Sequence, residues 1–287
     1  MRAHIAFSIC LALGAAACGS SAPDERFYTL QGQIVSIDAN RQQATIKHEE
    51  IKGFMSAMTM PYKIKDARLL DGMQPGDLIN AKLVILPNDA YLADVNKVGA
   101  APLEKTNAES PAAASPPLTL LRPGEAVPDA HFVDQDGKKL DFSSFKGSPT
   151  VVTFIYTRCP VPGFCPLMDH HFANLQEAAK SDAALKKLHL VSISFDPVSD
   201  TPPVLKKHAQ NLNADPARWT FLTGQVDDID RFAARFGVSI TRAKDNPLDI
   251  THTLRTAIVD AEGKLVKVYV GNEWTPIAVL ADLKHVG

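Results

Sequence analysis

The chain has 287 residues, enough for one large domain or two ordinary ones. Hydrophobic residues make up 45% of it, as in globular proteins, which excludes a chain that is disordered throughout. The 30 basic and 32 acidic residues nearly balance, so composition gives no reason to expect nucleic acid as a partner.

The first 18 residues are typical of a bacterial export signal. An uncharged apolar run from Ile5 to Cys18 is too short to span a bilayer but fits the hydrophobic part of a signal peptide. Ala15-Ala16-Ala17 precedes Cys18 as in a bacterial lipobox, although Ala15 stands where that motif usually has Leu. We predict a signal peptide over residues 1–18 and acylation of Cys18, which would anchor the protein by lipid on the periplasmic side of a bacterial membrane. Cleavage at an Ala-x-Ala site, with Cys18 left as a free thiol, is the alternative.

The cysteines limit the kinds of site that the exported part of the chain can contain. Of the 4 cysteines, Cys10 leaves with the signal peptide and Cys18 carries the lipid. Cys159 and Cys165 remain, close together, in an oxidising compartment where unpaired thiols are unusual. They are a structural disulfide, a redox pair or metal ligands.

Residues 24–98 show the pattern of a small all-β domain. Five short runs rich in β-branched or alternating apolar residues are separated by turns that contain Asp, Asn, Pro or Gly. These runs cover residues 27–37, 44–48, 59–64, 78–86 and 91–98. Five strands within about 70 residues favour an OB-like barrel. Residues 99–117, rich in alanine and proline, are predicted to be a linker that lets the flanking domains meet or separate.

Residues 118–287 alternate between strand and helix patterns. Strands are predicted over residues 151–157 and 189–195, helices over 166–187, 201–213, 227–236 and 276–285, and a hairpin over 256–260 and 265–270. This order is that of a thioredoxin-like α/β domain.

The two remaining cysteines lie where a buried strand ends and a helix begins. That edge of an open α/β sheet is where ligands bind, and the helix dipole lowers the pKa of a nearby thiol. Thiolates are soft donors suited to Cu(I). Five residues separate Cys159 from Cys165, against two in thiol-disulfide enzymes, and the wider gap leaves room for an ion.

A third ligand is expected from elsewhere in this domain. We predict His252, on the loop before the 256–260 strand, because in this fold that loop approaches the edge with the cysteines. Asp196 and Asp200 follow the second buried strand, and we favour turn and helix-cap roles over hydrogen bonding near the site. Met168 is expected to be a core residue.

The first domain contains a second cluster of soft donors. Met55, Met58 and Met60 fall within six positions and are followed by Pro61. Met58 and Met60 share one face of a strand, and His48 ends the preceding strand. Two thioethers and an imidazole favour Cu(I) or Ag(I). A methionine-lined core is the alternative.

Residues 118–287 resemble the Sco/SenC family, which delivers copper to the Cu(A) centre of cytochrome c oxidase. The resemblance rests on Phe154-Ile155-Tyr156-Thr157-Arg158-Cys159-Pro160, Cys165-Pro166-Leu167-Met168, Ser194-Phe195-Asp196-Pro197, Asp200-Thr201-Pro202 and His252-Thr253. It implies copper bound by Cys159, Cys165 and His252. Many family members have three residues between the cysteines, whereas this chain has five.

Residues 24–98 resemble the CusF-like periplasmic copper-binding module, which implies His48, Met58 and Met60 as ligands. Met55 stands where the best-known members place a Trp that covers the metal. We predict that Met55 is a further thioether ligand; the alternative is that it only packs and the ion stays three-coordinate.

Together these features predict a metallochaperone rather than an enzyme. It would bind Cu(I), with Cu(II) as a second state, and pass it to the oxidase subunit that carries Cu(A) or to another periplasmic copper protein. The alternatives are a thiol-disulfide oxidoreductase acting on the oxidase cysteines and a protein for copper storage or detoxification. There is no Cys-x-x-Cys motif, which weighs against the oxidoreductase.

Overall fold

The computed structural model describes residues 25–286 apart from Ser56, Asn88, 104–118 and 243–249. The predicted signal peptide and the predicted lipid site at Cys18 lie outside the described residues, as does most of the predicted linker. The first two residues of that linker, Gly99 and Ala100, belong to the last strand of the first domain.

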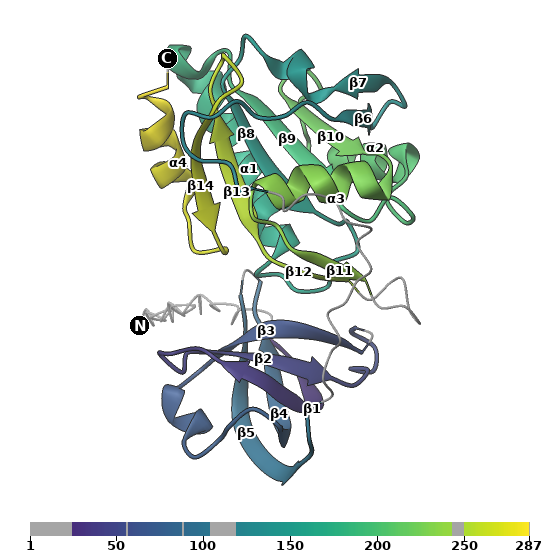
Figure 1. Ribbon diagram of the computed structural model, residues 1–287, viewed down its shortest axis with the longest axis vertical. Coiled ribbons are helices and arrows are strands. Elements are labelled where there is room, and N and C mark those ends of the chain that lie inside the picture. Colours follow the sequence, from purple (N-terminus) through teal and green to yellow (C-terminus); the bar gives the residue numbers. More distant parts are fainter. Residues whose placement is uncertain (1–24, 56, 88, 104–118, 243–249, 287) are drawn as a thin grey trace, which may run out of the picture.

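The first domain is a closed five-stranded barrel (Figure 1). Its strands lie in the order β1-β2-β3-β5-β4, with bounds β1 (Arg26–Ile37), β2 (Gln43–His48), β3 (Met58–Ile64), β4 (Asp77–Ile85) and β5 (Ala90–Ala100). A short 3-10 helix, η1 (Ala67–Leu70), lies between β3 and β4. The interior is filled by alternate residues such as Leu30, Ile46 and Leu83, which are fully buried. The predicted small all-β barrel is therefore confirmed.

The second domain is built on a seven-stranded sheet of order β14-β13-β8-β9-β10-β6-β7. Its strands are β6 (His131–Asp134), β7 (Lys139–Asp141), β8 (Thr150–Ile155), β9 (His189–Ser194), β10 (Trp219–Thr223), β13 (Arg255–Val259) and β14 (Leu265–Val270). The helices are α1 (Cys165–Ser181), α2 (Pro202–Asn211), α3 (Val226–Arg235) and α4 (Pro276–Leu283), with 3-10 turns η2 (Phe142–Phe145) and η3 (Ala183–Leu185). A separate two-stranded ribbon joins β11 (Ile240–Arg242) to β12 (Ile250–His252).

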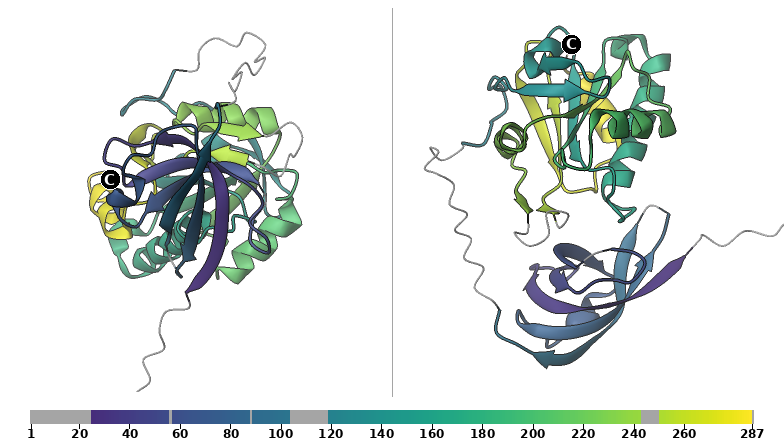
Figure 2. Two further views of the ribbon diagram at one scale, coloured as in Figure 1. Left: turned by 90° about the horizontal axis from the view of Figure 1, so that it is seen from below. Right: turned by 90° about the vertical axis from the view of Figure 1, so that its right-hand side faces the viewer.

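The central strands β8, β9 and β10 run parallel, and helices cover both faces of the sheet (Figure 2). Phe172 of α1 packs against Trp219 on one face, where α2 and α4 also contact α1. Phe232 of α3 packs against Phe132 and Phe154 on the other face. This arrangement confirms the predicted thioredoxin-like α/β class. Within the described part of the chain, no helix has the length and apolar character needed to cross a membrane.

Several details differ from the sequence predictions. Strand β10 was missed, although all five of its residues are buried. Helix α1 ends at Ser181 rather than at Lys187, because the Asp182 carboxylate accepts the amide of Ala184 and starts a 3-10 turn. His252 ends the short strand β12 and does not lie on a loop.

The barrel contacts the second domain through β3 and β12, which lie next to each other (Figure 1). The hydroxyl of Thr251 donates a hydrogen bond of 2.6 Å to the backbone carbonyl of Thr59. The loop between Cys159 and Cys165 also faces the barrel, because Val161, Gly163 and Phe164 line a cleft shared with β3. The strands and loops that carry the predicted ligands thus meet at one interface.

Gly32 of β1 is a position where the barrel leaves no room for a side chain. A Cβ atom there would lie 2.7 Å from the Lys47 carbonyl oxygen and 2.9 Å from the His48 Cα. We expect Gly32→Ala to destabilise the full chain by about 1–3 kcal/mol, measured by thermal unfolding, because β2 would have to shift. Gly99→Ala is the matched control, since its Cβ would meet only the Leu78 side chain at 3.6 Å. Equal melting temperatures for the two variants would contradict this account.

Candidate metal centres

The loop between β8 and α1 brings the two predicted thiol ligands together. Cys159 lies in the loop and Cys165 is the first residue of α1. Both are free thiols and both are buried, with 8% and 1% exposure. A hydrogen bond links the two side chains, and the Cys159 Sγ lies 3.9 Å from the Val161 carbonyl oxygen. The five intervening residues therefore fold back so that the sulfurs are neighbours.

The two thiols differ in acidity. The hydrogen bond from Cys165 lowers the pKa of Cys159, although burial opposes that shift. Burial raises the pKa of Cys165 well above its ordinary value. The predicted lowering of thiol pKa is therefore confirmed in direction for Cys159 and is wrong for Cys165. Desolvation outweighs the helix dipole at the helix N-terminus itself.

Two buried carboxylates fix the start of this loop. Asp200 accepts the amide of Thr157 at 3.0 Å and the hydroxyls of Thr157 and Ser194 at 2.5 Å. Asp196 accepts the Nε–H of Arg158 at 2.6 Å. The favoured helix-cap role was wrong for both side chains, because they bind the two residues that precede Cys159 while Thr201 occupies the N-cap of α2. Met168 is buried, as predicted.

His252 lies beside the thiols but not in contact with both of them. Its ring packs against Phe195 at 4.3 Å and edge-on against Tyr156 at 5.8 Å between ring centroids. Tyr156 in turn hydrogen-bonds Cys159. His252 is partly exposed as a residue, yet its Nδ1 is buried and has no hydrogen-bond partner among the residues that the structure describes. Desolvation lowers the pKa of His252 to about 4, so the imidazole is neutral at pH 7 and available as a donor.

The structure therefore brings Cys159 and Cys165 together and places His252 against the Tyr156 ring. Across the described residues, no three His, Cys, Asp or Glu side chains already stand close enough to hold a metal ion. Binding by all three predicted ligands requires the His252 side chain to turn toward the sulfurs.

The barrel collects the other predicted donors on one face of two paired strands. His48 of β2 lies directly opposite Met58 of β3, and Ile46 lies opposite Met60. Residues opposite each other, or two apart on one strand, share a face, so His48, Met58 and Met60 point to the same side. His48 and Met60 are buried, while Met58 is partly exposed.

The His48 ring is oriented for metal binding through one nitrogen. Its Nδ1 lies 2.7 Å from the Glu49 carbonyl oxygen, to which it must donate a proton. The buried Nε2 is then a lone-pair donor, and it has no hydrogen-bond partner in the described residues. Burial lowers the pKa of His48 and keeps the ring neutral. Metal-binding histidines usually have this arrangement, in which one ring nitrogen donates a hydrogen bond and the other binds the metal.

Met55 lies close to the same group of side chains. It is 7% exposed, and its sulfur accepts a hydrogen bond of 3.7 Å from the Tyr62 hydroxyl. The Tyr62 ring meets His48 edge-on at 5.7 Å. Sequence reasoning missed Tyr62, yet the two-residue strand period that joins Met58 to Met60 also puts Tyr62 on that face.

The fold and the donors define a class: a two-domain protein that combines a thioredoxin-like dithiol with a histidine–methionine cluster in a small barrel. All of these donors are soft or borderline, as proteins that bind monovalent copper require. The chain belongs to the SCO1/SenC family, whose model matches residues 122–286. Residues 28–97 match a second model, described as copper binding periplasmic protein CusF. Both resemblances found in the sequence are thereby confirmed, and the predicted metal, copper, agrees with the second description.

Individual relatives cover the second domain. A SCO1 protein homolog of Bacillus subtilis (strain 168) is 33% identical over 155 residues, which is 53% of this chain and 78% of that protein. A protein of Stutzerimonas stutzeri described as copper-binding is 29% identical over 149 residues, 51% of this chain and 70% of its own length. The crystal structure of a SCO1/SenC family lipoprotein from Bacillus anthracis str. Ames is similar with a TM-score of 0.51 and 29% identity, covering 58% of this chain and 99% of that one.

The acidity of the thiols can be tested by alkylation of the metal-free, reduced chain. We expect iodoacetamide to modify Cys159 before Cys165, with a rate that rises with pH through a pKa below the ordinary thiol value. Above that pKa the thiolate, which is the reactive form, predominates. Cys165→Ala should slow the modification of Cys159 at neutral pH, because it removes the S–H donor that lowers the pKa. Peptide mass spectrometry gives both rates; faster labelling of Cys165 would contradict the assignment.

Proposed function

We propose that this protein is an exported copper metallochaperone with two Cu(I) sites. One consists of Cys159, Cys165 and His252; the other consists of His48, Met58 and Met60, with Met55 as a further thioether ligand. The observation that carries the proposal is that each cluster contains a buried imidazole nitrogen without a hydrogen-bond partner in the described residues. Such a nitrogen costs free energy when it is left unpaired, and a bound metal ion removes that cost.

The donors suit Cu(I) better than other common ions. Thioethers bind Zn²⁺ and Mg²⁺ poorly, so a site with Met58 and Met60 selects a soft monovalent ion. The dithiol supplies anionic sulfur once its protons leave, which gives the second site the stronger attraction for Cu(I). In that site we expect His252 to complete a three-coordinate centre by turning past Tyr156.

The recipient we propose is the Cu(A)-bearing subunit of cytochrome c oxidase, with another periplasmic copper protein as the alternative. The support is membership of the SCO1/SenC family together with the match to a periplasmic copper-binding model. A lipid on Cys18 would hold the chain at the membrane, where an oxidase subunit is within reach; the similar Bacillus anthracis protein is described as a lipoprotein. Copper storage or detoxification would use the same two sites without a recipient.

A second candidate function is reduction of disulfides, and one observation favours it. Cys159 has a lowered pKa and Cys165 a raised one, the asymmetry of a dithiol that attacks with one sulfur and resolves with the other. Such a role would act on the cysteines of the copper recipient. It is compatible with copper delivery, since both need the thiols reduced.

Anaerobic titration with Cu(I) tests the two-site proposal. We expect the full chain to bind two equivalents. Cys159→Ser with Cys165→Ser should remove one, and Met58→Ala with Met60→Ala should remove the other. Met73→Ala is a matched control, because Met73 is a partly buried methionine of the barrel outside the cluster. His252→Ala should weaken copper binding at the dithiol only. A wild type that binds one equivalent, lost in either double variant, would contradict the proposal.

The place of Met55 can be tested in the chain that carries Cys159→Ser and Cys165→Ser, so that copper occupies the barrel alone. X-ray absorption should find three sulfur ligands, because Met55 exchanges its weak hydrogen bond from Tyr62 for a bond to the ion. Met55→Leu should lower the count to two, whereas Met73→Leu should leave it at three. Two sulfurs in all three proteins would mean that Met55 only packs.

A further inference from the structure

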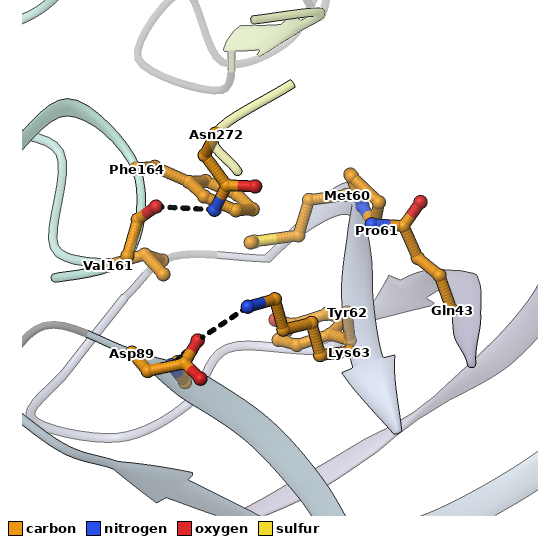
Figure 3. A pocket seen from close by; sticks show the side chains of 11 residues that line it. Gln43, Met60, Pro61, Tyr62, Lys63, Asp89, Val161, Phe164 and Asn272 are labelled. Atoms are coloured by element: carbon orange, nitrogen blue, oxygen red, sulfur yellow. Dashed lines mark hydrogen bonds and ion pairs between the residues drawn. The ribbon is translucent and has the colours of Figure 1, made fainter. Parts of the chain in front are cut away.

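A narrow cleft separates the two clusters at the domain interface (Figure 3). One wall comes from the barrel and includes Met60, Pro61 and Tyr62. The other comes from the cysteine loop and includes Val161 and Phe164. Figure 3 shows the Met60 side chain pointing from β3 toward these two loop residues. The cavity volume is about 20 Å³, which holds roughly one water molecule or a bare ion and excludes a hydrated one.

A hydrogen bond joins β3, which carries Met58 and Met60, to β12, which carries His252. Thr59, whose carbonyl accepts it, lies between Met58 and Met60 in β3. Thr251, whose hydroxyl donates it, directly precedes His252 in β12. The bond therefore sets β12, with the histidine of one cluster, against the methionines of the other.

The long loop between the cysteines is the part of the second domain that faces Met60 across the cleft. Gly163 approaches the barrel so closely that a Cβ atom there would lie 3.5 Å from the Asp89 Cα. The Asn272 amide holds this turn by donating a hydrogen bond of 2.6 Å to the Gly163 carbonyl. Phe164 immediately precedes Cys165, and the Cys159 sulfur lies against the Val161 carbonyl. The residues that face Met60 are thus next to the thiols in sequence and in space.

We propose that Cu(I) passes directly from the His48–Met58–Met60 cluster to the Cys159–Cys165 thiols of the same chain through this interface, with Met60 as the last barrel ligand to leave. The inference rests on the proposed function, because it requires both clusters to bind copper. The step is a ligand exchange: bonds from copper to thioether sulfur and imidazole nitrogen break, and bonds to thiolate sulfur form. Copper stays Cu(I), and each thiol that binds gives its proton to water.

The direction of transfer follows from the donors. Thioethers and a neutral imidazole carry no charge, whereas a thiolate is anionic and softer, so Cu(I) moves toward the dithiol. Burial explains why a direct route is needed. Cys159 and Cys165 are 8% and 1% exposed, so an ion from solvent has little access to them. A neighbouring donor domain also raises the effective concentration of copper to the millimolar range, about that of short linked modules.

A trapping experiment on the full chain distinguishes direct transfer from release. The Cys159–Cys165 pair is first oxidised to a disulfide, and one equivalent of Cu(I) is loaded into the barrel under argon. A phosphine then reduces the disulfide while bathocuproine disulfonate competes in solution for any copper that is released. We expect the chelator to capture several-fold less copper from the wild type than from a mixture of two half-site chains. One half-site chain carries Cys159→Ser with Cys165→Ser and is loaded with copper. The other carries Met58→Ala with Met60→Ala and is oxidised and metal-free.

Variants at the interface between β3 and β12 test whether direct transfer depends on the contact between the two domains. Thr251→Val removes the hydroxyl that bonds Thr59 and should raise the captured fraction. Thr241→Val is the matched control, because Thr241 is the exposed partner of Thr251 on β11 and should behave like the wild type. Equal capture from the wild type and the half-site mixture would overturn direct transfer. Failure of the oxidised chain to bind copper, or absence of copper–thiolate absorption when the disulfide is reduced without the chelator, would instead overturn the proposed function.

Discussion

The arrangement of the dithiol depends on one buried carboxylate. Asp200 is fully buried and accepts three hydrogen bonds, two from Thr157 and one from Ser194. These partners follow β8 and end β9, so the carboxylate ties together the edges of the two central strands. A buried carboxylate is stable only when it is well hydrogen-bonded. These hydrogen bonds therefore stabilise both the carboxylate and the ends of the two strands that it joins. The loop that carries Cys159 starts from this fixed point, and its far end reaches the barrel.

Periodicity predicted both domain classes and most strand positions, because the signals are strong in this chain. The 27–37 run, for example, became β1 with a change of one residue at its start. Strand β10 was missed because Trp219–Thr223 is a short buried run without alternation, and periodicity alone cannot tell such a run from a buried helix segment. The end of α1 was missed because it depends on a hydrogen bond that the Ala184 amide donates to the Asp182 carboxylate, which competes with helix continuation.

The sites, like the fold, have some features that the local sequence predicted and others that it did not. Strand period and register placed His48, Met58 and Met60 on one face, and the strand–helix junction placed Cys159 and Cys165 at the sheet edge. For Asp196 the sequence favoured the wrong one of two roles, since its partner Arg158 lies 38 positions away in sequence and an Asp-Pro turn accounts for the residue locally. The pKa of Cys165 was misjudged for a related reason. Burial depends on packing by distant segments, whereas the helix dipole can be read from local sequence.

The five-residue spacing between the cysteines decides how the two domains of this chain fit together. Val161, Gly163 and Phe164 supply the second domain's wall of the interdomain cleft together with Asn272, and all three come from the interval between the cysteines. A shorter loop could still pair its sulfurs but would lack the residues that reach β3. In this chain the length of the loop is therefore what allows the residues beside the thiols to form one cleft with the barrel.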